Sequence, residues 1–346
     1  MAKRIVAIYD RGIDKNLMQG FDVLEKYGYE LTLVEKTVNE DELAYQNSML
    51  SVEVNGPDGT PINEEVFQHL DDAEIIITHF APVSRRMIAA AKNLKIIATL
   101  RTGMENINME AAKERGIKVI NAPGRAAVAV ADFTVAAMLC EIRNIARTDE
   151  DIKTGGWTKK YPNRTYSDNM CNLKVGLVGF GDIGRKIATR LKGFGTTILA
   201  YDPYCTKESI EAFGCVPVSL DKLLEQADFV SLHVRLSPQT QNMFGAAEFA
   251  KMKPTAIFVN AARAGLVDEA AMIDALEQKK IGGAVLDVFR EEPLPVDHPL
   301  RKLKNVTLSA HLAGTDIGTF SGSIKIVADN LEQYFSGGEL KNVVNH

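Results

Sequence analysis

Residues 173–184 read LKVGLVGFGDIG, and this stretch decides the fold of the region around it. An apolar run typical of a buried parallel strand leads directly into Gly179, Gly181 and Gly184, which have the spacing G-x-G-x-x-G. A segment with helical periodicity follows, and a second apolar strand ends at Asp202. Strand, glycine loop, helix, strand and terminal acid therefore occur in the order of a dinucleotide-binding βαβ unit.

Each glycine of this loop meets a different structural requirement. Gly179 permits the tight turn, Gly181 lets the backbone approach a pyrophosphate, and Gly184 lets the helix pack close to the strand. The helix N-terminus offers free N–H groups to the phosphates. Asp202 is placed to accept hydrogen bonds from the adenosine ribose hydroxyls, and it would repel a 2′-phosphate. The pattern therefore predicts NAD, in preference to NADP, as the cofactor.

Length and composition exclude several other classes of protein. With 346 residues the chain exceeds a comfortable single core, which favours two domains. Its formal net charge of −5 argues against nucleic acid as a main partner. No apolar run approaches the ~20 residues of a membrane helix, and the N-terminal strand is too short for a signal segment. We therefore expect a cytoplasmic protein without a membrane partner.

The four cysteines indicate neither a metal site nor a disulfide framework. Cys140, Cys171, Cys205 and Cys215 are scattered and form no C-x-x-C pair. Free thiols in a reducing compartment are the plain interpretation, and we expect no metal.

Strands alternate with helices almost throughout, which predicts an α/β protein with a doubly wound parallel sheet. We expect strands in two blocks, at 4–9, 31–35, 75–78, 95–100, 173–178, 197–202, 229–234, 256–259, 284–287 and 306–308. A helix over 126–145 connects the blocks, and a helix over 318–335 is expected to return to the first domain. We therefore predict a discontinuous substrate-binding domain, 1–121 with 312–346, and a nucleotide-binding domain, 122–311.

Two irregular stretches interrupt this pattern. Residues 36–63 are long for a connection and contain the turn signal Asn55–Gly59. Because Ser51–Val54 alternates like a short strand, we expect an extra hairpin or flap there. Residues 147–171 are expected to form an irregular connection.

Polar side chains follow the later strands, where ligands of α/β sheets bind. Arg263 follows the strand 256–259, where its planar guanidinium can hold a carboxylate or form a salt bridge to a nearby acid. Asp287 ends a buried strand and is placed to bond a nicotinamide carboxamide. Glu292 lies in the loop beyond, where it is a solvated acid or a partner for a cation.

His311 follows the last strand and is the candidate proton donor. Hydride transfer to a ketone needs a donor that titrates near neutrality. A carboxylate beside His311 would raise the pKa of the imidazole and hold its tautomer, and Glu292 is a candidate for that role. His233 ends a different strand, and His79 follows a strand of the first block.

The chain resembles the D-isomer-specific 2-hydroxyacid dehydrogenase family over nearly its whole length. The resemblance lies in the glycine motif with Asp202 and in segments 102–107, 114–124, 233–238, 260–269, 286–293 and 311–314. It implies that Arg263, Glu292 and His311 are the catalytic trio and that two Rossmann-like or flavodoxin-like domains flank a cleft. It also implies contacts to NAD from Asp182, Ile183, His233, Ala261, Ala262, Arg263, Asp287, His311, Ala313 and Gly314.

The resemblance further implies that Arg101, Thr102 and Gly103 hold the substrate carboxylate, together with Arg263 and His311. It implies reversible hydride transfer to a small 2-keto acid of glycerate, phosphoglycerate or sugar-acid type, and a homodimer through the helix 126–145. Glu292 argues against formate dehydrogenases, which carry glutamine there, whereas phosphite dehydrogenases remain a rival.

The chain departs from the family at Arg235, Ala264 and Ser309-Ala310. Arg101, Arg125 and Arg235 add positive charge that leaves the identity of the substrate open. Because the chain ends soon after Val344, we expect no regulatory domain of the kind found in many phosphoglycerate dehydrogenases. An NAD-sensing scaffold without catalysis, like corepressors of this fold, is the alternative from a different functional class.

Overall fold

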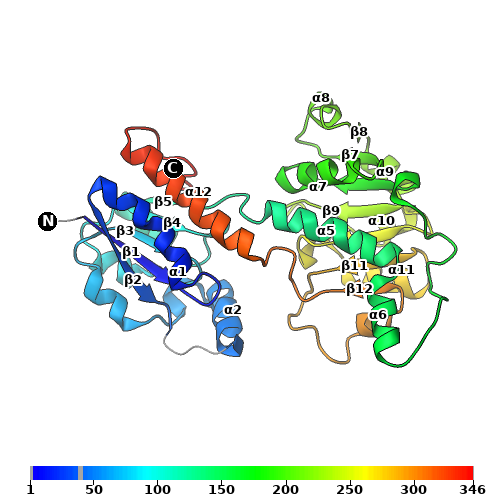
Figure 1. The fold of residues 1–346 in the computed structure, drawn as a ribbon, viewed down its shortest axis with the longest axis horizontal. Helices are drawn as coiled ribbons and strands as arrows, with labels where there is room; N and C mark the ends of the chain where they lie inside the picture. Colours follow the sequence, from blue (N-terminus) through cyan, green and yellow to red (C-terminus); the bar gives the residue numbers. More distant parts are fainter. Residues whose placement is uncertain (1–2, 38–41, 346) are drawn as a thin grey trace. The chain divides into compact units, whose positions relative to one another are not determined.

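The computed structural model describes residues 3–37 and 42–345, and they form two compact units (Figure 1). Unit 1 comprises residues 1–125 and 316–346, and unit 2 comprises residues 126–315. Each unit contains a parallel sheet with helices on both faces, so the predicted α/β class is confirmed. The two units divide the chain after residues 125 and 315. The domain boundaries after residues 121 and 311 stay predictions.

Unit 1 contains a five-stranded sheet in the order β2-β1-β3-β4-β5, the flavodoxin-like arrangement. The strands are β1 (Lys3–Tyr9), β2 (Tyr29–Glu35), β3 (Ala73–Thr78), β4 (Ile96–Thr99) and β5 (Lys118–Ile120). Its helices are α1 (Lys15–Met18), α2 (Glu42–Gly59), α3 (Arg85–Ala90), α4 (Met109–Glu114) and α12 (Ile317–Phe335), with 3-10 helices at Gln19–Tyr27 and Glu64–His69.

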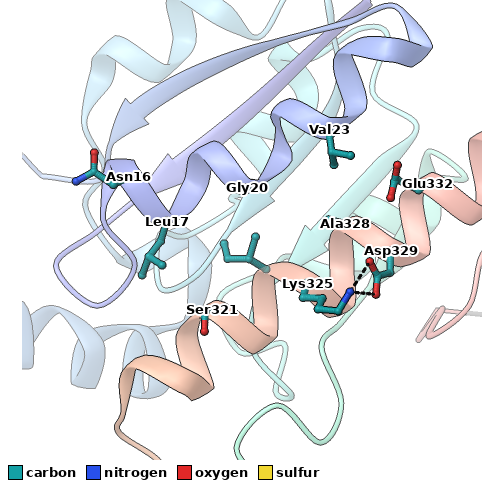
Figure 2. Close-up of a pocket in the computed structure, with 10 residues that line it drawn as sticks. Asn16, Leu17, Gly20, Val23, Ser321, Lys325, Ala328, Asp329 and Glu332 are labelled. Carbon is teal, nitrogen blue, oxygen red and sulfur yellow. Dashed lines mark hydrogen bonds and ion pairs between the residues drawn. The ribbon is translucent and has the colours of Figure 1, made fainter.

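The returning helix α12 packs beside the 3-10 helix Gln19–Tyr27 on one face of this sheet (Figure 1). A Cβ atom on Gly20 would lie 2.7 Å from Cγ2 of Ile324, so glycine allows the close approach of these two helices. A shallow groove follows the same seam, where Lys325 and Asp329 form an exposed ion pair (Figure 2). The groove lies along helices and away from the strand ends, so it is not the candidate active site.

Unit 2 contains a seven-stranded sheet in the order β12-β11-β10-β9-β6-β7-β8. Its strands are β6 (Lys174–Val178), β7 (Thr197–Tyr201), β8 (Val216–Pro217), β9 (Phe229–Leu232), β10 (Ile257–Asn260), β11 (Gly283–Leu286) and β12 (Val306–Leu308). Counted from β6, the first six follow the Rossmann order 3-2-1-4-5-6, and the strand order reverses between β6 and β9.

Two buried clusters cover the faces of this sheet. One face packs against α5 (Ala127–Ile142) and α7 (Asp182–Lys192), and the other against α9 (Leu220–Gln226), α10 (Ala246–Lys251) and α11 (Glu269–Glu277). The remaining helices are α6 (Ile145–Lys153), α8 (Lys207–Glu211) and 3-10 helices at Met170–Asn172, Ala264–Leu266 and Pro299–Lys302. With both faces covered, the central strands are buried, as their apolar sequences predict.

The expected hairpin in residues 36–63 is wrong, because Ser51–Val54 lies inside α2. Alternation over four residues is too short to separate a strand from a helix, and the buried Val52 serves a helical face equally well. The turn signal does act locally: Gly56 has a φ of 66° and interrupts the helix. The part of the expected insertion at 38–41 lies outside the described residues.

The expected helix over 126–145 is α5, which ends at Ile142, and a second helix, α6, begins at Ile145. Asn144 adopts the left-handed conformation, with a φ of 56°, between α5 and α6. Its side chain donates to Oδ1 of Asn163 at 2.7 Å, so a contact 19 residues away stabilises the break. Residues 147–153, predicted to be irregular, therefore belong to α6.

Candidate active site

The glycine loop of unit 2 has the geometry that its sequence predicts. Gly179 has a φ of 99°, and a Cβ there would lie 2.6 Å from the backbone oxygen of His233. A Cβ on Gly184 would lie 2.4 Å from the backbone oxygen of Gly179, so α7 packs directly on the loop. No larger residue fits at either position without moving backbone.

The loop ends at the N-terminus of α7, which Gly181 caps. A Cβ on Gly181 would meet no atom within 4 Å, so the backbone there borders open space. Asp182 and Ile183, both predicted cofactor contacts, form the first turn of the helix. A helix N-terminus with an open glycine in front of it suits the pyrophosphate of a dinucleotide.

Asp202 follows β7 and holds the glycine loop. Its Oδ2 accepts a hydrogen bond from the backbone N–H of Phe180 at 2.7 Å, and its Oδ1 accepts one from Tyr204 at 2.8 Å. Each carboxylate oxygen can accept a further bond. The carboxylate thus lies beside the glycine loop, where the ribose contact was predicted.

His233 follows β9 beside Gly179 and hydrogen-bonds through Nε2 to Oγ of Ser231 at 2.8 Å. Desolvation lowers the pKa of His233 to about 3, so this imidazole is neutral. A neutral histidine next to the switch point of the sheet suits a polar contact to a cofactor and not acid catalysis.

Arg263 lies in the loop after β10. Asn260, the last residue of β10, stabilises this loop through hydrogen bonds from its side chain. The Asn260 Oδ1 accepts from the backbone N–H of Ala262 at 3.0 Å, and its Nδ2 donates to the backbone oxygen of Arg263 at 3.0 Å. The exposed Arg263 guanidinium donates to the oxygen of Ala262 at 2.7 Å. Asn260 thus positions Arg263, a role that the sequence analysis missed although the residue lies in the same motif.

Asp287 is buried after β11 and organises the segment that carries His311. Its carboxylate accepts hydrogen bonds from the backbone N–H groups of Leu312 and Ala313, each at 2.9 Å, and from Oγ of Ser309 at 2.6 Å. His311 has a φ of 54°, which is uncommon for a residue other than glycine. The structure therefore shows Asp287 in a positioning role; its predicted contact to nicotinamide stays a prediction.

His311 and Glu292 form a direct pair, as the sequence suggested. Nδ1 of His311 lies 2.8 Å from Oε2 of Glu292, and Oε1 of Glu292 accepts from the backbone N–H of Phe289 at 2.9 Å. The Glu292 hydrogen bond raises the pKa of His311 against the opposing effects of desolvation and Arg263. Burial alone would raise the pKa of Glu292, but His311 and the Phe289 N–H lower it. Histidine is thereby favoured as imidazolium beside a carboxylate.

The three predicted substrate-binding residues outside this trio belong to unit 1. Arg101 follows β4 and is buried, whereas Thr102 is exposed. The Thr102 hydroxyl donates to the oxygen of Ala122 at 3.3 Å, and Asn121 donates to the oxygen of Thr102 at 2.7 Å. These bonds anchor the turn that ends in Gly103.

Another histidine–carboxylate pair, which the sequence did not reveal, lies in unit 1. His79, after β3, contacts both carboxylate oxygens of Asp10, after β1, at 3.1 Å. The two residues are 69 positions apart, and only the order of the strands brings them together. Both are buried.

Neither a group of metal-ligating side chains nor a membrane-spanning helix occurs among the residues that the structure describes. There, no three histidine, cysteine or acidic side chains lie close enough together to ligate a metal ion. Among the same residues, no helix combines the length and the apolar character needed to span a bilayer.

The Rossmann strand order, the glycine cradle and Asp202 define unit 2 as a dinucleotide-binding domain. Residues 135–313 match the family described as "D-isomer specific 2-hydroxyacid dehydrogenase, NAD binding domain". The chain belongs to the D-isomer specific 2-hydroxyacid dehydrogenase family, and NAD is its cofactor.

Known relatives agree with this assignment. The chain is 38% identical over 284 residues to a D-3-phosphoglycerate dehydrogenase of Methanocaldococcus jannaschii, covering 82% of this chain and 53% of that one. It is 37% identical over 287 residues to a glyoxylate reductase of Korarchaeum cryptofilum, covering 82% and 86%. The crystal structure of the TT0316 protein from Thermus thermophilus is similar with a TM-score of 0.74, 28% identity and coverage of 98% and 99%.

The chain spans only about half the length of the phosphoglycerate dehydrogenase it matches. Its relatives also carry different substrate names.

Proposed function

We propose that this protein is an NAD-dependent oxidoreductase that interconverts a small 2-keto acid and the corresponding D-2-hydroxy acid. The observation that carries the proposal is the His311–Glu292 pair at 2.8 Å, with Arg263 close enough to influence the pKa of both residues. The strands of the nucleotide-binding sheet are thus followed by a proton donor, His311, and by its carboxylate partner, Glu292. They are also followed by Arg263, a cation that can bind a substrate carboxylate.

The residues present fit the cofactor. The open backbone at Gly181 and the N-terminus of α7 would hold the pyrophosphate, and Asp202 would hold the adenosine ribose. Bound NADH supplies the hydride that reduces the keto carbon.

The chain's own residues supply charge and a proton. The Arg263 guanidinium binds the substrate carboxylate through paired hydrogen bonds and polarises the keto oxygen. Because Nδ1 of His311 bonds Glu292, Nε2 is the nitrogen left to donate a proton to that oxygen. Glu292 stabilises the imidazolium before transfer, and in the oxidative direction His311 accepts the proton back.

Asn260 and Asp287 keep this machinery in place. Asn260 closes the Arg263 loop, and Asp287 holds the backbone next to His311 in its left-handed conformation. Residues that fix a catalytic side chain within a narrow range of positions contribute to the rate without touching the substrate. We also propose that the backbone of residues 101–103 contributes to binding the carboxylate.

The test is a spectrophotometric assay of NADH oxidation with glyoxylate, pyruvate, hydroxypyruvate, oxaloacetate and 3-phosphohydroxypyruvate, with NADPH in parallel. We expect turnover with NADH that Arg263→Ala abolishes and that NADPH does not support. Binding of NADH without turnover of any keto acid would contradict the proposal and favour the non-catalytic scaffold. Turnover of phosphite alone, run as a separate NAD⁺ assay, would contradict it as well.

We further propose that the protein is a homodimer through the α5–α6 region. Four large apolar side chains are exposed there, namely Val128, Ile145, Ile152 and Trp157, with Trp157 exposing 79% of its surface. Apolar surface concentrated in one region marks an interface. Light scattering of the purified chain should give twice the mass of 37.9 kDa, and Trp157→Lys should weaken the association.

A further inference from the structure

Five side chains converge at the carboxyl ends of the unit 1 strands. Asp10 follows β1, His79 and Phe80 follow β3, and Arg101 follows β4; Arg125 lies beyond β5. Ligands of open α/β sheets bind at this edge.

Asp10 is the anchor of the cluster. Its Oδ1 accepts from the backbone N–H groups of Gly12 and Ile13, at 2.9 and 3.0 Å, and its Oδ2 accepts from that of Phe80 at 3.1 Å. Burial alone would raise the pKa of Asp10, but His79 and the backbone donors of Ile13 and Phe80 lower it to about 2. The carboxylate is therefore ionised and accepts a hydrogen bond from His79.

His79 connects Asp10 to Arg125 through its two ring nitrogens. Its Nδ1 lies 3.1 Å from Asp10, and its Nε2 lies 3.3 Å from Nη1 of Arg125. A guanidinium only donates, so Nε2 is the acceptor and the single proton of the neutral ring is on Nδ1. Desolvation and the nearby Arg125 and Arg101 charges lower the pKa of His79 despite Asp10. An imidazole in this state orients Arg125 without neutralising its charge.

Arg101 brings a second guanidinium to the cluster. Its Cζ lies 4.1 Å from the centre of the Phe80 ring, a cation–π contact that holds the guanidinium in place. Glu105 contacts Arg101 at 3.5 Å, but its side chain is half exposed. At 3.5 Å and with the Glu105 carboxylate half in water, this ion pair is a weak one.

We propose that Arg125, oriented by His79 and Asp10, forms with Arg101 a binding site for a second anionic group of the substrate, a carboxylate or a phosphate. The proposal deepens the proposed function and rests on it. Two guanidiniums match the planar oxygens of carboxylate and phosphate. The preferred substrates are then 2-keto acids that carry an anionic group in addition to the one at C1.

The first experiment compares kcat/KM of the full-length protein for pyruvate with that for oxaloacetate and 3-phosphohydroxypyruvate. We expect the wild type to prefer a dianionic substrate. Arg125→Gln should lower kcat/KM for that substrate by about tenfold to a hundredfold, mainly through KM, and change that for pyruvate by less than about threefold. Oxaloacetate and 3-phosphohydroxypyruvate distinguish a carboxylate from a phosphate.

Two variants serve as comparisons. Arg86→Gln removes an exposed arginine of α3 that pairs with Glu64, and it should leave the preference unchanged. His79→Gln should reduce the preference for the dianionic substrate in the same sense as Arg125→Gln, because His79 is a positioning residue that acts through the guanidinium. A structural role alone would lower the rates for all three keto acids equally.

A second measurement does not depend on turnover. Inorganic phosphate, or malonate as the carboxylate probe, should raise the thermal unfolding temperature of the wild type and of Arg86→Gln at constant ionic strength. The rise should be smaller in Arg125→Gln, and the difference separates binding at the site from the general stabilising effect of these salts.

The outcomes distinguish this inference from the proposed function. If no keto acid is reduced, the proposed function fails, and the unfolding measurement alone decides the anion site. Equal rises in unfolding temperature for wild type and Arg125→Gln would overturn the site. A wild type that prefers pyruvate, or an Arg125→Gln variant that loses the same factor for every substrate, would overturn it as well.

Discussion

The His311–Glu292 pair and the His79–Asp10 pair have the same residue chemistry, but the pKa of the histidine is shifted in opposite directions. In unit 2, His311 contacts Glu292, is half exposed and has a raised pKa. In unit 1, His79 contacts Asp10, is buried and has a lowered pKa. A carboxylate at hydrogen-bond distance favours the imidazolium in both cases, so the difference comes from the surroundings.

Desolvation and neighbouring cations explain the difference. Burial removes water from the His79 ring, and two arginines oppose a further positive charge there. His311 keeps contact with water, and Asp287 adds a second negative charge. His311 can therefore supply a proton, whereas the His79 imidazole stays neutral beside the ionised Asp10 and orients its neighbours.

The largest expected effect is the loss of the proton donor. His311→Asn should lower kcat for keto-acid reduction by about a hundredfold to ten-thousandfold, the range of general acid catalysis. NADH binding, measured by fluorescence titration, should change little because the glycine loop is intact. His79→Asn is the matched variant and should retain most activity toward pyruvate. An equal loss of kcat in both variants would contradict the different roles of the two histidines.

The next effect is a change in pH dependence. Reduction needs protonated His311, so kcat should fall as pH rises through its raised pKa. Glu292→Gln removes the main cause of that raised pKa and should move the fall to lower pH. Near pH 8 we expect kcat to drop by about tenfold or more. If kcat of Glu292→Gln fell at the same pH as kcat of the wild type, the titrating group would not be His311.

Stability should respond to Asp10. Its pKa of about 2 lies below the ordinary value of 3.8, so the carboxylate stabilises the fold above pH 3.8 and loses this contribution as pH falls toward 2. Asp10→Asn places an amide against backbone donors and should cost about 2–3 kcal/mol. Urea unfolding at neutral pH measures the cost; a change within experimental error would remove Asp10 as the anchor.

The smallest perturbation is a titration that alters no residue. Side-chain NMR of labelled histidines should give a midpoint for His311 above 6.5, with His79 below 6.5 and His233 at about 3. Assignment uses the single His311→Asn and His79→Asn variants. Two ordinary midpoints near 6.5 would show that the surroundings do not separate the pairs.

Much of unit 2 was predictable because its signals are local. The strand before Gly179, the glycine spacing and the helix after it lie within one short segment, and each residue meets its structural need inside that segment. Apolar runs bounded by polar residues predict the strands that precede Arg263, Asp287 and His311. Parallel strands align their carboxyl ends at one edge, so these side chains lie in one region.

Predictions failed where local patterns were ambiguous. The alternation in Ser51–Val54 fits a helix as well as a strand, and the structure contains α2 there. The break at Asn144 depends on Asn163, which no helical periodicity within 126–145 reports. Asn260 was quoted within its motif, but its bond back to the Arg263 backbone appears only in three dimensions.

The sequence by itself determined the fold class and the NAD-binding loop, because short-range spacing and residue chemistry suffice for these. It offered Arg263, Glu292 and His311 as candidates through a family resemblance. Only the tertiary structure decided which acid meets which histidine and in which direction the pKa of that histidine is shifted. The pairing of His79 with Asp10 follows from the adjacency of β1 and β3, and the pKa of each ring follows from burial by several elements distant in sequence. Desolvation and charge act through space, so the chain order does not reveal them.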